Sequence, residues 1–129
     1  MAGFDWNTFY SLFKAKMSGI CTVGRYTIPK DPKYPYVDIA LSDISGGNYD
    51  LQNNEGSQMP MITITVYCNN YDDAKCYEVS MEIKKFMLSY GFQCKLQPRK
   101  IDNSDPAVAR WVARYRRVFG NGDKLMQVN

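Results

Sequence analysis

The side chains of this 129-residue chain that are best suited to chemistry are four cysteines, thirteen carboxylates and a group of arginines. Histidine is absent. A Ser-His-Asp triad, a Cys-His dyad and a histidine metal cluster are therefore excluded. The cysteines lack the paired C-x-x-C spacing of most structural zinc sites, which leaves a four-cysteine zinc site as a minor alternative. We expect free thiols, as in a reducing cytoplasm, at Cys21, Cys68, Cys76 and Cys94.

The carboxylates give no better candidate for catalysis. Asp72 and Asp73 are adjacent at the start of a helical pattern, so they point in different directions around the helix. Glu78 and Glu82 lie on the polar face of the same pattern, each with a lysine three residues away as a partner. The chain also contains no glycine-rich phosphate loop and no dinucleotide-binding fingerprint. We therefore expect a protein that is not an enzyme and that needs no cofactor.

The densest charged feature is a group of four arginines near the C-terminus, with two aromatic residues between them. The arginines are Arg110, Arg114, Arg116 and Arg117. If residues 107–119 form a strand, Trp111 and Tyr115 point to one face, and Arg110, Arg114 and Arg116 point to the other. The aromatic side then belongs to the core. The arginine side is then an exposed basic stripe that can contact an acidic protein or DNA phosphates.

Composition is typical of one globular domain. Apolar residues make up 45% of the chain, and the net charge is only +3. Ten tyrosines suit either protein interfaces or half-buried sheet positions. No apolar run reaches the roughly 18 residues of a membrane span, and Asp5 precedes the first lysines, unlike a secretion signal. We expect a soluble domain over residues 1–120, followed by a flexible tail at 121–129.

Apolar periodicity predicts both helices and strands. Helical spacing covers residues 4–18 and 72–90, and Gly91 is placed to end the second helix. Alternating or β-branched stretches predict strands at 20–28, 36–41, 61–68, 92–96 and 107–119. Pro98 either ends the strand that begins at residue 92 or places it at a sheet edge. The chain is therefore expected to fold as an α/β domain.

Residues 42–60 are polar and contain several glycines. A segment of this length is too long for an ordinary connection, so we interpret it as a functional loop or a protruding arm. Tyr49 and Leu51 within it are candidates for ordering on contact with a neighbouring molecule.

The order of these segments resembles the tail terminator proteins of long-tailed bacteriophages, which are also called tail completion or minor capsid proteins. The resemblance covers about three quarters of the chain. It is carried by the aromatic N-terminal helix, the strands at 34–39 and 62–67, the end of the second helix at 87–92 and the late strand at 110–115.

The resemblance implies an α+β fold, with a mostly antiparallel sheet of four to five strands packed by two helices. It also implies a homo-oligomeric ring, typically of six subunits, that caps the tail tube at the tail-neck junction of the virion after assembly in the host cytoplasm. The ring then contacts the tail tube protein and the head-neck connector protein, and genomic DNA passes through it without sequence-specific contacts. In such a ring the arginine stripe lines a subunit interface or the lumen. Two alternatives stay open: another head-tail connector or neck protein, and a nucleic-acid-binding module that uses the arginine stripe.

Overall fold

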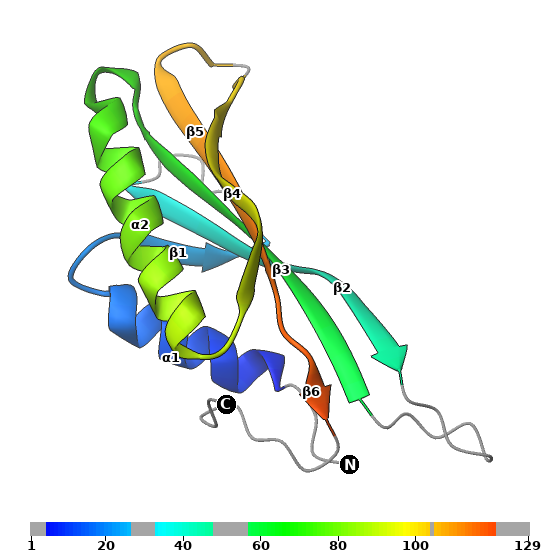
Figure 1. The fold of residues 1–129 in the computed structure, drawn as a ribbon. Coiled ribbons are helices and arrows are strands. Elements are labelled where there is room, and N and C mark those ends of the chain that lie inside the picture. Colours follow the sequence, from blue (N-terminus) through cyan, green and yellow to red (C-terminus); the bar gives the residue numbers. More distant parts are fainter. Residues whose placement is uncertain (1–4, 27–32, 48–56, 104, 121–129) are drawn as a thin grey trace.

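The computed structural model describes residues 5–26, 33–47, 57–103 and 105–120, which form two α-helices, one short 3₁₀ turn and six strands (Figure 1). Every helix and strand expected from the sequence is present, and the α+β class is confirmed. In chain order the elements are α1 (Trp6–Met17), β1 (Thr22–Arg25), β2 (Tyr36–Gly47), β3 (Ser57–Asn69), η1 (Asn70–Asp72), α2 (Asp73–Ser89), β4 (Gln93–Ile101), β5 (Val108–Arg116) and β6 (Phe119–Gly120).

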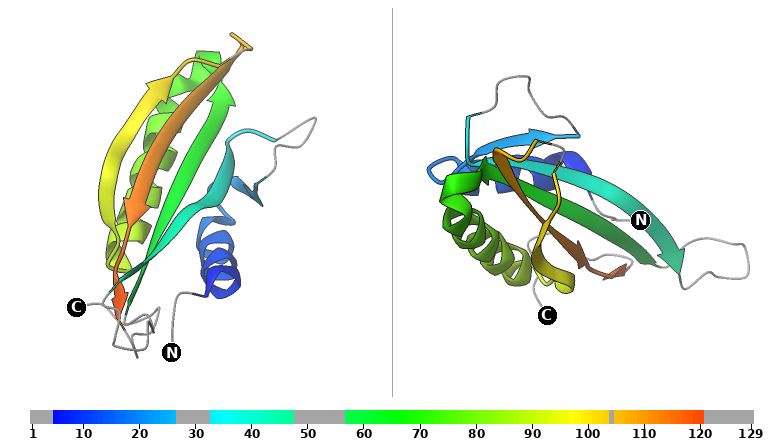
Figure 2. Two further views of the ribbon diagram at one scale, coloured as in Figure 1. Left: turned by 90° about the vertical axis from the view of Figure 1, so that its right-hand side faces the viewer. Right: turned by 90° about the horizontal axis from the view of Figure 1, so that it is seen from above.

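The strands form one mixed sheet in the order β1-β2-β3-β5-β4. Only the β1–β2 pair is parallel, while β2–β3, β3–β5 and β5–β4 are antiparallel. The short β6 pairs with the beginning of β3, beyond the end of β5. The sheet is strongly twisted (Figure 2). Because β4 is an edge strand, it tolerates Pro98 within its span, which confirms the edge alternative.

Local sequence signals set the ends of both helices. The Asp5 carboxylate caps α1 by accepting a hydrogen bond from the Thr8 backbone N–H at 3.2 Å. At the end of α2, Gly91 has a φ of +83°, a left-handed conformation that glycine adopts easily. The Gly91 N–H donates to the Leu88 carbonyl and the Phe92 N–H donates to the Met87 carbonyl, which forms a Schellman motif. The predicted stop at Gly91 is confirmed.

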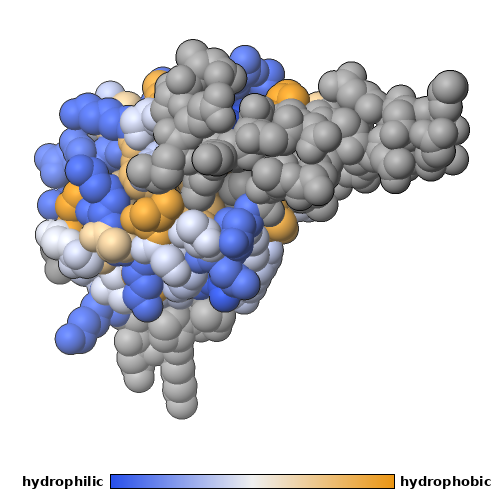
Figure 3. Space-filling view, turned by 90° about the horizontal axis from the view of Figure 1, so that it is seen from below, coloured by the Kyte–Doolittle hydropathy of each residue, from blue (hydrophilic) through white to orange (hydrophobic). Residues whose placement is uncertain are grey.

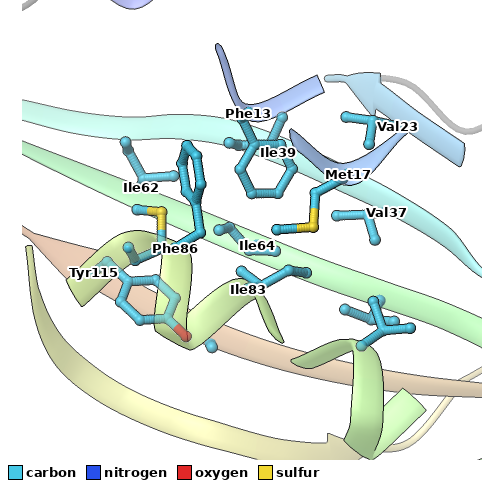
Figure 4. Close-up of a cluster of buried hydrophobic side chains, with 14 of the residues drawn as sticks. Phe13, Met17, Val23, Val37, Ile39, Ile62, Ile64, Ile83, Phe86 and Tyr115 are labelled. Atoms are coloured by element: carbon cyan, nitrogen blue, oxygen red, sulfur yellow. The ribbon is translucent and has the colours of Figure 1, made fainter. Parts of the chain in front are cut away.

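Both helices contribute to a single core on one face of the sheet (Figure 4). Phe9, Phe13 and Met17 come from α1 at helical spacing and are fully or almost fully buried. The Phe13 and Phe86 rings meet edge to face, with centroids 5.4 Å apart. The core also contains these residues from α2 and the strands: Val23, Val37, Ile39, Ile62, Ile64, Val66, Cys76, Val79, Ile83, Met87, Ala109, Ala113 and Tyr115.

The expectation of a loop over residues 42–60 is wrong at both ends. β2 continues to Gly47 and β3 begins at Ser57, so Asp43↔Met61 through Gly47↔Ser57 form a two-stranded hairpin. Glycine and serine are poor strand formers, so the composition of this segment does not predict a strand. The segment is a strand because pairing between its two halves supplies the backbone hydrogen bonds. Residues 48–56, which include the candidates Tyr49 and Leu51, lie outside the described residues, as does the predicted tail 121–129.

No helix in the described ranges is long and apolar enough to cross a membrane. Seen from below, the described surface is mostly hydrophilic, with small hydrophobic areas between the polar residues (Figure 3).

Candidate functional site

The predicted arginine stripe lies on the face of the sheet opposite the core. Strand pairing places Arg110 opposite Tyr67, Arg114 opposite Thr63 and Arg116 opposite Met61. With a rise of about 3.3 Å per residue, Arg110 and Arg114 stand about 13 Å apart along β5. Arg114 is exposed, while Arg110 and Arg116 are half-buried. The stripe therefore has one fully accessible cation between two that are partly enclosed.

Arg110 belongs to a packed polar cluster rather than to a free surface. Its guanidinium donates a hydrogen bond to the Asp102 carbonyl in the β4–β5 connection. It lies beside Tyr67, whose ring centroid is 6.3 Å from that of Tyr36. Burial raises the pKa of Tyr67, and the neighbouring Arg110 charge partly opposes this shift. Arg110 is therefore already engaged within the fold.

The two aromatic residues of β5 face the helices, as the alternation predicts. Tyr115 is fully buried, and burial raises its pKa above the usual range. The Trp111 indole Nε1–H donates to Asp73 Oδ1 at 2.9 Å, and its ring contacts Tyr77 edge to face. Because Trp111 and Tyr115 lie on the face opposite the arginine stripe, β5 by itself does not form the stacking platform of a single-stranded nucleic-acid binder.

The Trp111–Asp73 hydrogen bond should make a measurable contribution to stability. Trp111→Phe keeps an aromatic side chain but removes the indole donor and some ring volume, so we expect the free energy of unfolding to fall by at least about 1 kcal/mol. Asp73→Ala also removes the 3.6 Å ion pair with Lys100, so a double-mutant cycle is needed to isolate the indole contact. Urea unfolding of the four proteins measures the coupling energy. Strictly additive effects would show that the hydrogen bond adds nothing.

Arg117 does not belong to the stripe. The alternation of β5 continues for one residue and turns this side chain toward the helices, where it is 5% exposed. Its guanidinium donates to the Tyr90 carbonyl at the C-terminal end of α2, where the helix dipole favours a cation. A Cβ at Gly91 would lie 3.5 Å from Arg117 Nε, so the helix end packs closely on this side chain. Arg117 is therefore buried and stabilises the fold, whereas the sequence grouped it with the candidate interface residues.

A basic cavity of about 440 Å³ lies where β4 meets the end of β5. Among the described residues, the lining contains three cations and no carboxylate side chain: Met59, Gly91, Gln93, Lys95, Arg116, Arg117 and Val118. The arginine cluster did not reveal Lys95 as a neighbour, because Lys95 is far from it in the chain. Antiparallel pairing brings the two strands together, with Gln93 opposite Arg116. We name this site the basic cavity.

The four cysteines are free thiols. Cys76 is buried, and its sulfur lies 3.7 Å from the Val66 carbonyl oxygen and 3.8 Å from that of Ala109. A hydrogen bond with the Cys68 thiol and burial raise the pKa of Cys76 well above its usual range. Within the described part of the chain, no three His, Cys, Asp or Glu side chains cluster as metal ligands would. The buried thiols act as small core residues.

The β2–β3 hairpin extends beyond the region that the helices cover (Figures 1 and 2). The last pair between β1 and β2 is Arg25↔Ile39, and over the described residues β2 has no strand partner on that side beyond this pair. On the other side, β5 ends opposite Met61 and β6 pairs only with Ser57 and Gln58. Just beyond this pair, the Leu41 backbone N–H donates to the Tyr26 hydroxyl at 3.0 Å, and that hydroxyl lies 3.2 Å from the Leu41 carbonyl oxygen. Past Leu41, no described strand pairs with the outer edge of the hairpin.

Comparison of the chain with protein-family models and with curated protein sequences finds no match. Three features of the described structure remain as candidate binding surfaces: the projecting hairpin, the arginine stripe and the basic cavity. All three are suited to binding another macromolecule.

Proposed function

We propose that this protein is a non-enzymatic assembly subunit of a long-tailed bacteriophage, and that it caps the tail tube as a homo-oligomeric ring at the tail-neck junction. The order of helices and strands resembles that of tail terminator proteins. The projecting β2–β3 hairpin is the observation that carries the proposal.

The hairpin supports assembly because it is poorly stabilised by its own chain. A two-stranded ribbon is marginal in water unless a third strand or a helix covers it. Among the described residues, β6 covers only the first two residues of β3. No described strand pairs with the outer side of β2 beyond Ile39, where the Tyr26 hydroxyl bonds the Leu41 backbone. An open strand edge of this kind pairs readily with another chain. A neighbouring subunit or the tail tube would supply that partner.

The arginine stripe fits the same role. Arg114 is exposed on the face that the described helices leave open, and Arg116 lies two residues beyond it. Cations in this arrangement attract phosphates regardless of base sequence, as a channel for passing DNA requires. At a subunit interface, the same cations would pair with carboxylates instead.

Oligomeric state tests the proposal directly. We expect size-exclusion chromatography with light scattering to show a multi-subunit species, and negative-stain images to show rings, alone or on purified tail tubes. A monomer at every concentration, even with tail tubes present, would contradict the proposal. Steep salt-dependent binding of oligonucleotides by such a monomer, lost on Arg114→Ala, would instead identify a nucleic-acid-binding module.

A further inference from the structure

Tyr26, the residue directly after β1, has a backbone conformation that bulky side chains rarely adopt. Its φ is +59°, and in the described part of the chain no other residue except glycine has a positive φ. This left-handed conformation costs free energy for an aromatic residue, so it persists only where surrounding contacts hold it. Burial does not hold it, because the residue is 57% exposed. A specific contact must therefore fix Tyr26.

That contact joins the Tyr26 hydroxyl to the backbone of β2. The Leu41 N–H donates to the hydroxyl at 3.0 Å, and the hydroxyl donates to the Leu41 carbonyl oxygen at 3.2 Å. The last pair between β1 and β2 is Arg25↔Ile39, so the hydroxyl meets β2 where strand pairing on this side has just ended (Figure 1). One side chain therefore makes both hydrogen bonds that a neighbouring strand would make at Leu41.

Contacts with α1 hold the end of β1 in the position that this arrangement requires. The Arg25 guanidinium donates to Asn7 Oδ1 at 2.7 Å and lies 4.4 Å from the centroid of the Tyr10 ring. The Tyr26 ring in turn contacts Trp6, with ring centroids 5.9 Å apart. The hydroxyl of Tyr26 reaches an exposed strand edge, so the backbone of another chain can compete for the same hydrogen-bonding groups.

The pairing of β2 with β3 changes at the same place. The register shifts between Leu41 and Asp43, which makes Ser42 the extra residue of a β-bulge. The Ser42 hydroxyl donates to the Met61 carbonyl oxygen at 3.1 Å and accepts from Thr63 Oγ1 at 3.0 Å. A bulge twists a strand locally and makes its edge a poorer template for another chain. The bulge and the tyrosine contact therefore protect the same point of the β2 edge.

We infer that Tyr26 is a latch on the outer edge of β2, and that a strand from a second copy of this chain displaces it during assembly. The inference rests on the proposed function, since it names the contact that controls pairing of the β2–β3 hairpin with a neighbouring subunit. A second copy can supply a strand, because the opposite side of its sheet ends in the edge strand β4. An added strand needs the Leu41 N–H and carbonyl, so the hydroxyl must leave. Tyr26 is then released from its left-handed conformation, which offsets part of the loss.

Tyr26→Phe tests the latch, because it keeps the aromatic ring and removes only the hydroxyl. The Leu41 backbone groups are then open to a neighbouring strand, so assembly should begin at a concentration about tenfold lower than for the wild-type chain. Light scattering over a dilution series measures this concentration. Tyr77→Phe is the matched control, because Tyr77 lies on α2 and is similarly exposed, at 51%; this variant should assemble as the wild type does.

Leu41→Pro shows whether the gain in assembly uses the β2 edge. Proline has no N–H to donate, and the Leu41 N–H points to Tyr26 and away from β3, so β2 keeps its pairing with β3. Tyr26→Phe/Leu41→Pro should therefore lose the tenfold gain. Tyr26→Phe/Leu41→Ala also shortens the side chain but keeps the N–H, so it should retain the gain.

Hydrogen exchange at the Leu41 amide reports which partner it has. In a dilute, monomeric sample, Tyr26→Phe should speed exchange at this amide. In the assembled particle the amide should be equally protected in the variant and the wild type, because a strand of the neighbouring copy is then its acceptor. Rapid exchange in assembled Tyr26→Phe alone would show that the hydroxyl keeps its contact in the particle, and the latch would be overturned.

The remaining outcomes are equally decisive. A folded Tyr26→Phe variant that assembles no more readily than the wild type overturns the latch, since Tyr26 then serves only the fold or the interface. A gain that requires purified tail tubes overturns the second copy as the partner. Circular dichroism checks the fold, and Tyr26→Gly, which suits a φ of +59°, should give the same gain if Tyr26→Phe is unfolded.

Failure of the latch is distinguishable from failure of the ring proposal. A wild-type chain that never assembles contradicts the proposed function itself. A wild-type ring that forms at the same concentration with Tyr26→Phe leaves the function in place and overturns only the latch.

Discussion

Replacing Phe13 by alanine should lower the free energy of unfolding by about 3–5 kcal/mol. The side chain is fully buried, packs on Phe86 edge to face and lies 6.4 Å from the ring of Phe9. Its removal leaves a cavity between α1, α2 and the sheet. Movement of the short helix α1 can fill this cavity only in part. The free energy of unfolding of a domain of this size is about 5–15 kcal/mol, so this single substitution would remove a large part of it.

Chemical denaturation of the purified chain measures the effect. Leu88→Ala provides the control, because Leu88 on α2 is 47% exposed, and we expect it to cost less than about 1 kcal/mol. If both substitutions lower the free energy of unfolding by equally small amounts, the packing of α1 against the core contributes little to stability. Assays of assembly should use conditions in which the Phe13→Ala variant remains folded.

Shortening the β2–β3 hairpin should abolish assembly while leaving the domain folded. Ser45 and Met59 are directly paired, so residues 46–58 can be replaced by an Asn-Gly turn that closes the hairpin at this pair. None of the described core side chains lies in the replaced segment, and the change also removes the pairing of β6 with Ser57 and Gln58, so we expect the free energy of unfolding to change by no more than about 1–2 kcal/mol. Light scattering should show a monomer.

A matched variant separates the length of the hairpin from its chemistry. Replacing residues 48–56 by glycine and serine keeps the length and removes Asp50 and Glu55. If side chains of this segment contact a neighbouring subunit or the tail tube, this variant is also monomeric. Normal assembly of the shortened chain would remove the hairpin from the proposal. Unfolding of the shortened chain would instead show that the hairpin is part of the folded domain.

The local elements of this protein are readable from its sequence because their causes are local. Phe9, Phe13 and Met17 recur at helical spacing, so α1 has one face that must be buried. Gly91 ends α2 because the left-handed conformation there suits glycine. Strict alternation along β5 correctly separates Trp111 and Tyr115 from Arg110, Arg114 and Arg116, since successive strand side chains point to opposite faces.

The longer-range features depend on which strands meet. Residues 42–47 are strand because they pair with Ser57–Met61, although their composition predicts a loop. Arg117 is adjacent to Arg116 in the chain, yet the alternation of β5 and the carbonyl at the end of α2 draw it into the interior. Lys95 joins the basic cavity only because β4 pairs with β5.

The sequence by itself therefore determined the helices, the strands, the α/β class and the charged residues available for binding. It determined these because capping, periodicity and composition act over a few residues. The tertiary structure alone decided which arginine is buried, where the hairpin projects and which cations surround the basic cavity. Those outcomes follow from the register and order of the sheet, and strand pairing joins residues that are far apart in the chain.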